Sequence, residues 1–223
     1  MNVWIKFPER CIKNTKIDKS KIYEKASVSS KFKSKFVSDI DKIIWLYNLS
    51  ASELNIEGTD ELQEIQIFEI KLRNKDIDFN LLKIIDKAIL SPVVFLLSYE
   101  KEYRYVLAYK KLSKDKTSTE LKSSYLSSVW FEKDQAPESD LNISLSIKNL
   151  YFNLLKLFCE YEINDSNLDS YFQTYEKILK LESNIKTLRL KLSKQKQFNR
   201  KVEINIELQE KEQELNSLLN AKS

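Results

Sequence analysis

The chain has 223 residues, of which 42% are hydrophobic and 31% are charged, so it has enough apolar material for one compact core together with long solvated helices. It contains no histidine and a single glycine, Gly58. The lack of histidine excludes Ser-His-Asp and Cys-His catalysis and imidazole metal sites. One glycine cannot form the glycine-rich loops that bind nucleotide phosphates, and two cysteines are too few for a zinc cluster. We therefore expect no cofactor and no metal site, and any enzymatic interpretation depends on Asp, Glu and Lys.

The sequence lacks membrane and export signals. No apolar run reaches the ~18 residues that a membrane-spanning helix needs, and the first residues have no apolar segment of the secretory type. The two cysteines, Cys11 and Cys159, could form at most one bridge, and Cys159 is most simply a buried small hydrophobe, which favours a reducing compartment. We expect a cytoplasmic protein that does not enter a membrane.

The net charge of +4 is unevenly spread along the chain. Residues 1–38 carry ten Lys or Arg against three acidic residues, and residues 177–201 carry nine against Glu182 alone. Residues 202–223 reverse the sign. Basic clusters of this density can neutralise phosphates, although an AT-rich coding bias explains the N-terminal one more simply.

The first half of the chain predicts a mixture of helices and strands. Residues 1–30 are polar and irregular, with Pro8 preventing a regular start, and apolar spacing of three and four residues predicts a helix over 30–48. Residues 64–73 predict a largely buried strand. A helix follows it, with Asp76 or Asp78 as its N-cap, and ends before Pro92.

The rest of the first 163 residues continues this pattern. Residues 92–110 predict two strands joined by a polar turn at Glu100-Lys101, and residues 121–132 predict a further strand. Residues 134–140 read as a linker and residues 143–161 as a helix rich in Leu and Phe. We predict an α+β fold for residues 1–163, in which helices pack on a mixed β-sheet.

Residues 164–223 predict a long C-terminal helix of the coiled-coil type. No Gly or Pro follows the N-cap formers at 164–167, and roughly 55 helical residues would reach about 80 Å. An apolar seam runs through Ile178, Leu181, Ile185, Leu188 and Leu192. It is interrupted by polar residues around 195–199, as a stutter or a specificity patch. Val202 and Ile206 then continue this first frame, and a second apolar frame opens through Leu208, Leu215 and Leu219. The opposite charges of the two halves favour antiparallel self-pairing or docking along a partner.

An exposed seam of this length needs a partner in water. We expect the partner-binding residues to be Ile185, Leu188, Leu192, Phe198, Val202 and Leu208. The basic side chains beside them are candidates for contact with DNA phosphates, unless they are only the solvated flanks of a coiled coil; they are Lys191, Lys194, Lys196, Arg200 and Lys201.

Three segments, KFVSDIDKIIWLYNLSASELNI, EIQIFEIKLRNK and KQKQFNRKVEINIELQEKEQEL, together resemble the bacterial and archaeal domain-of-unknown-function family numbered four-three-nine-one. The resemblance covers nearly the whole chain and carries no catalytic residues. Members of that family tend to be encoded beside helicases and DNA methyltransferases of restriction-type systems. The resemblance therefore implies a non-catalytic accessory subunit of a restriction or anti-phage assembly, with the C-terminal helix binding a protein partner or a second copy of the chain.

A second hypothesis is a magnesium-dependent nuclease. Glu69-Ile70-Lys71 is an E-x-K triplet on a predicted strand, and it resembles the last motif of the restriction-endonuclease superfamily, in which the carboxylate holds Mg²⁺ and the lysine orients the attacking water. That motif should follow a hairpin that supplies an aspartate, and here only Asp60, in a turn-like stretch, is at hand. The triplet also arises easily by chance in this composition. A toxin or antitoxin-like regulator has only small size and basic charge in its favour.

Overall fold

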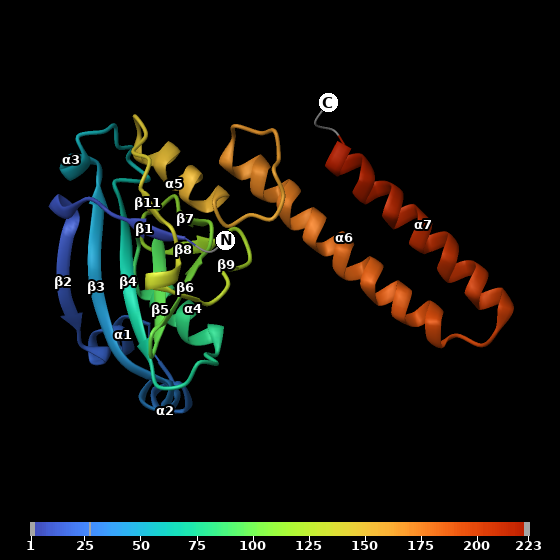
Figure 1. Cartoon of the computed structure of the whole chain (residues 1–223), viewed down its shortest axis with the longest axis horizontal. Helices are drawn as coiled ribbons and strands as arrows, with labels where there is room; N and C mark the ends of the chain where they lie inside the picture. Colours follow the sequence, from blue (N-terminus) through green and yellow to red (C-terminus); the bar gives the residue numbers. More distant parts are fainter. Residues whose placement is uncertain (1–2, 27, 221–223) are drawn as a thin grey trace. The chain divides into compact units, whose positions relative to one another are not determined.

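The computed structural model describes residues 3–26 and 28–220. The chain divides into two compact units, residues 1–159 and 160–223. The first unit mixes strands and helices and the second is helical, which confirms the predicted α+β class (Figure 1). None of the helices formed by the described residues combines the length and the apolar character that a bilayer span requires.

The first unit is built on a seven-stranded mixed sheet. Six of its strands are ordered β10-β6-β5-β4-β3-β2, and the seventh, β9, also pairs with β6. Within this sheet β4 and β5 are parallel, and the other pairs are antiparallel. The seven strands are β2 (Ile12–Ile17), β3 (Ile40–Ser50), β4 (Glu64–Leu72), β5 (Val93–Tyr99), β6 (Glu102–Leu107), β9 (Leu126–Ser127) and β10 (Phe131–Glu132).

Two further strand pairs lie outside this sheet. β1 (Trp4–Lys6) pairs in parallel with β11 (Glu138–Asp140), and β7 (Lys110–Leu112) pairs with β8 (Thr119–Leu121). Residues 134–140, predicted as a linker, thus include a strand. The strand predicted over 121–132 is wrong in extent, because it is divided between the end of β8, β9 and β10.

Helices cover both faces of the main sheet. The apolar core on one face combines β3, β4 and β5 with Ile22, Phe36 and Leu82 from three helices. On the other face Phe158, just beyond α5, packs its ring 5.7 Å from the ring of Tyr105 on β6. The helices of this unit are α1 (Lys19–Ala26), α2 (Ser30–Asp39), α3 (Ala51–Leu54), α4 (Phe79–Ala88) and α5 (Ile147–Lys156), and the 3-10 turns are η1 (Glu9–Cys11) and η2 (Lys133–Gln135).

The predictions for 64–73, for the hairpin at Glu100-Lys101 and for the N-cap at Asp78 are confirmed: the Asp78 carboxylate accepts from the backbone N–H of Asn80 at 2.9 Å. The helix predicted over 143–161 is shorter and begins after Ser146. The irregular start predicted for residues 1–30 is wrong, since β1, β2 and α1 form there. Residues 1, 2 and 27 of that stretch lie outside the described residues.

The helix predicted over 30–48 is wrong in its second half. α2 ends at Asp39, and the chain continues as β3, which pairs with β2 on one side and β4 on the other. Its isoleucine, tryptophan and tyrosine side chains are β-branched or aromatic and fit a pleated surface with neighbours on both sides. Pairing with two strands therefore overrides an apolar spacing that is equally compatible with a helix.

The second unit is a helical hairpin rather than a continuous rod. α6 (Leu168–Lys194) begins at the N-cap Asn167, and α7 (Phe198–Asn220) lies beside it after a three-residue break (Figure 1). The single helix of about 55 residues was therefore a wrong prediction. At the break the side-chain oxygen of Gln195 accepts from the backbone N–H groups of Lys196 and Gln197, at 2.8 and 3.1 Å. These bonds satisfy donors that a continuous helix would have satisfied itself.

Candidate functional site

The E-x-K triplet lies in the middle of the main sheet. Glu69 and Lys71 are two residues apart on β4, so their side chains share one face, and a Glu69 oxygen lies 3.8 Å from the Lys71 Nζ. The Ser98 hydroxyl of β5 donates to Glu69 Oε1 at 2.8 Å. The Glu69 side chain is only 12% exposed, whereas Lys71 is 44% exposed. The carboxylate is thus held in place by two neighbours.

The hairpin that an E-x-K motif requires is present, because β3 precedes β4 and runs antiparallel to it. Its aspartate is Asp41, which the predicted helix over 30–48 concealed. Asp41 lies in the bulge between Ile40 and Lys42 and pairs with Arg73 at 2.8 Å. The residue directly opposite Glu69 is Ile44. An apolar side chain, Ile44, therefore occupies the position at which an aspartate would lie opposite Glu69.

Asp60, the acidic residue proposed from the sequence, is not brought to this place. Asp60 lies in the turn closed by the Thr59–Leu62 pair, just before β4 begins. Glu69 and Lys71 lie near the other end of β4. No cluster of three acidic, histidine or cysteine side chains suited to a metal ion occurs among the described residues. Since Mg²⁺ is held by several oxygen ligands, Glu69 and the Ser98 hydroxyl would need a further carboxylate to hold the ion.

The seam of the helical hairpin is closed within the chain. Ile185 and Leu188 of α6 form an apolar cluster with Leu208 of α7, and each is no more than 7% exposed. Leu192, Ile204 and Leu215 pack around them. Ion pairs join the two helices as well, with Arg189 to Glu212 at 2.6 Å and Lys177 to Glu214 at 2.9 Å. Four of the six predicted partner-binding residues are therefore occupied by the hairpin itself: Ile185, Leu188, Leu192 and Leu208.

The frame shift in the sequence has a structural explanation. The second frame, through Leu208 and Leu215, is the face that α7 turns toward α6. The first frame continues on α7 through Val202 and Ile206, which are 43% and 52% exposed, and Phe198 before them is 77% exposed. These three residues are spaced four apart and so lie on one side of the helix. We call Phe198, Val202 and Ile206 the α7 ridge.

Exposed basic side chains surround the start of the ridge. Lys191 and Lys194 lie in the last turn of α6, where cations interact favourably with the helix dipole. Lys196 lies in the break, and Arg200 and Lys201 lie in the first turn of α7, where no acidic residue is present. Cations at a helix N-terminus are unfavourably placed. All five are exposed, and no carboxylate pairs with them in the part of the chain that the structure describes.

These features define an α+β protein with a helical hairpin whose tip, at the break between α6 and α7, is both apolar and basic. The chain belongs to the DUF4391 family, described as a domain of unknown function, whose model matches residues 5–215. The predicted kinship is thereby confirmed. No curated protein and no solved structure matches the chain.

Proposed function

We propose that the protein is a non-catalytic accessory subunit of a restriction-type or anti-phage defence complex, and that the α7 ridge is its docking surface for a partner subunit. The proposed partners are the helicase or DNA methyltransferase subunits that the family resemblance implies. The observation that carries the proposal is the ridge itself. Three apolar side chains stay exposed on α7 although the hairpin seam beside them is closed.

The spacing of the ridge suits a helix of the partner. Side chains at four-residue steps form the ridge that packs into the groove of another helix. From Phe198 to Ile206 the ridge is about 12 Å long. A stable interface between two proteins buries at least about 1,000 Å², which three side chains cannot supply alone. This favours one attachment point within a larger assembly over an independent homodimer.

The basic residues of the tip extend the proposal to DNA. No acidic residue occurs between 183 and 202, the stretch that contains Lys191, Lys194, Lys196, Arg200 and Lys201. Phosphate contacts of this kind position a protein on DNA without reading its sequence. We propose that they contact the backbone of DNA held by the partner subunit.

The test is co-purification of the full chain with the products of neighbouring genes, followed by light scattering. Phe198→Ser is expected to abolish a complex that the unchanged protein forms, because it removes the most exposed side chain of the ridge. Leu145→Ser is the matched control, since Leu145 is 90% exposed in the first unit. A protein that stays monomeric in every mixture, or a complex equally weakened by both substitutions, would refute the docking role.

The magnesium-dependent nuclease remains as a second candidate because β3 and β4 form the hairpin that the E-x-K motif requires. The isoleucine opposite Glu69 and the ion pair of Asp41 weigh against it. Cleavage of plasmid DNA that needs Mg²⁺ and is lost in both Glu69→Ala and Lys71→Ala would establish the nuclease. Unchanged DNA would leave the accessory role as the better supported function.

A further inference from the structure

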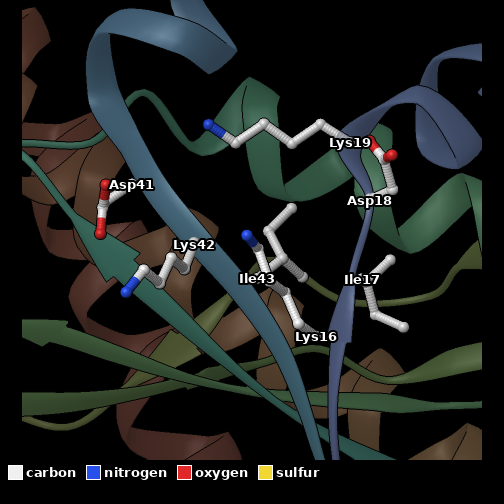
Figure 2. Close-up of a pocket in the computed structure, with 7 residues that line it drawn as sticks. All are labelled: Lys16, Ile17, Asp18, Lys19, Asp41, Lys42 and Ile43. Carbon is white, nitrogen blue, oxygen red and sulfur yellow. The ribbon is translucent and has the colours of Figure 1, made fainter.

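A basic pocket lies where β2, β3 and the start of α1 meet. Figure 2 shows the seven side chains that line it: Lys16, Ile17, Asp18, Lys19, Asp41, Lys42 and Ile43. Three of them are lysines. All belong to the first unit, and the pocket is remote in sequence from the basic tip of the hairpin.

The strand register extends this basic cluster across the sheet. Lys42 of β3 lies directly opposite Lys71 of β4, and Lys16 of β2 lies directly opposite Ile44. Ile44 and Lys42 are two residues apart, so Lys16, Lys42 and Lys71 share one face. Like charges directly opposite each other on neighbouring strands are destabilising. Lys71 is paired with Glu69 at 3.8 Å, so of these two opposed lysines it is Lys42 whose charge a ligand would neutralise.

The acidic residues nearby are already engaged. Asp41 pairs with Arg73 at 2.8 Å, and Glu69 accepts from Ser98. The Asp18 carboxylate accepts from the backbone N–H of Ser20 at 3.0 Å. Lys16 and Lys42 are exposed, and neither forms an ion pair with a carboxylate within residues 3–26 and 28–220.

Lys19 adds a fixed positive charge to the pocket wall. Its Nζ donates to the carbonyl oxygens of Phe36 and Ile40 at 3.2 and 2.6 Å, which anchors the side chain. Burial, and then the positive charge of Arg73, lowers the pKa of Lys19, and Lys16 acts in the same direction although Asp41 opposes it. Lys16 and Lys19 line the same pocket, and an anion placed between their ammonium groups would be attracted to both.

We propose that this pocket binds a phosphate group, with Lys16 and Lys42 as its ligands and Lys19 supplying further positive charge. Lysine is a common phosphate ligand that acts as a point charge. The phosphate can belong to a polynucleotide backbone or to a free nucleotide, and both present the same chemistry to the pocket. The site is independent of the α7 ridge and of the proposed docking role.

The experiment measures binding of three probes to the full chain: a fluorescent DNA 15-mer by anisotropy, and ATP and inorganic phosphate by thermal stabilisation. Lys16→Gln/Lys42→Gln is expected to weaken binding at least about tenfold and to reduce the slope of log K against log salt by about 1.4 to 1.8. Lys114→Gln/Lys116→Gln is the matched control, because it removes two exposed lysines from the loop after β7. It is expected to change binding less than twofold.

A second variant separates binding from folding. Lys16→Arg/Lys42→Arg keeps both charges and is expected to retain binding, whereas the glutamine variant should be at least as stable as the unchanged protein in phosphate-free buffer. Binding of the 15-mer alone assigns the site to a polynucleotide, and stabilisation by ATP or phosphate assigns it to a small ligand. Equal losses in the glutamine variant and the control, or no binding of any probe, would overturn the proposal. Loss of the complex in Phe198→Ser would leave it unaffected.

Discussion

Replacing Lys110 should destabilise the first unit strongly, because this lysine is the buried partner of a buried carboxylate. The side chains of Lys110 and Asp86 are only 1% and 4% exposed. Lys110 Nζ donates to Asp86 Oδ1 at 2.6 Å and to the carbonyl oxygens of Asp86 and Ile89 at 3.0 and 2.9 Å. Tyr125 donates its hydroxyl hydrogen to Asp86 Oδ2 at 2.7 Å. One ammonium group thus neutralises a carboxylate and satisfies two carbonyls at the end of α4.

The loss of folding stability in a Lys110 variant depends on the buried groups that lose their partner, above all the Asp86 carboxylate. Lys110→Met keeps most of the side-chain volume but leaves a buried charge unpaired, which costs about 3–5 kcal/mol. Adding Asp86→Asn removes that charge and should recover part of the loss. It cannot recover all of it, because each carbonyl left without a donor costs about 1–3 kcal/mol. The double variant should therefore be more stable than Lys110→Met alone.

Urea unfolding followed by circular dichroism measures these differences, and Lys122→Met provides the control. Lys122 pairs with Glu120 at the same 2.6 Å, but both side chains are well exposed, so its loss should cost less than about 1 kcal/mol. The reasoning is refuted if Lys110→Met costs no more than Lys122→Met. It is also refuted if the effects of Lys110→Met and Asp86→Asn simply add.

Three further predictions concern single side chains. Burial on its own would raise the pKa of Glu64, but hydrogen bonds donated by Ser91, Gln66 and Asn48 lower this pKa below the ordinary 4.5. The stability that the carboxylate contributes is therefore present above its unfolded-state pKa and is lost as the pH falls. Acid unfolding of Glu64→Gln should depend less on pH below about 4.5 than that of the unchanged protein, and an unchanged acid profile would contradict this. Leu208→Ala, in the closed seam, should cost about 2–5 kcal/mol of hairpin stability by hydrogen exchange, whereas Phe198→Ala should cost almost nothing, and equal costs would show that the ridge is not free. Asn167→Ala removes the side-chain oxygen that accepts from the N–H groups of Asp169 and Ser170 and should cost about 1 kcal/mol, with faster exchange confined to the first turn of α6; exchange that is faster along the whole helix would contradict a local cap.

The sequence predicts strands well where apolar runs are bounded by clear turns. β4, β5 and β6 follow β-branched and aromatic runs, and the N-cap of α4 follows from the aspartate that precedes it. The prediction of a helix over 30–48 is wrong in its second half, because apolar spacing alone cannot distinguish a helix from a strand that is paired along both edges. Only the register with β2 and β4 decides it, and this register depends on residues far away in the chain.

The candidate sites show the same limit. Asp41 and Lys42 could not be placed beside Glu69 and Lys71 while their segment was predicted to be a helix. The reversal at 195–197 contains no Gly or Pro, so local composition gives no stop signal. The polar residues and the second frame indicated a break in the seam, but whether the two halves pair within one chain is decided by tertiary contacts between Leu188 and Leu208.

The pairing of β1 with β11 has a consequence for how the chain is synthesised. Trp4 is matched with Glu138, and its ring packs 5.1 Å from the ring of Tyr103. During synthesis β1 therefore has no partner until residues 138–140 have also emerged from the ribosome, and closing so long a loop is entropically costly. The helical hairpin depends on contacts that are much closer in sequence, which form quickly. During translation β1 should thus be among the last elements of its unit to become ordered, and a chain that stalls before residues 138–140 are made should leave it open to proteases.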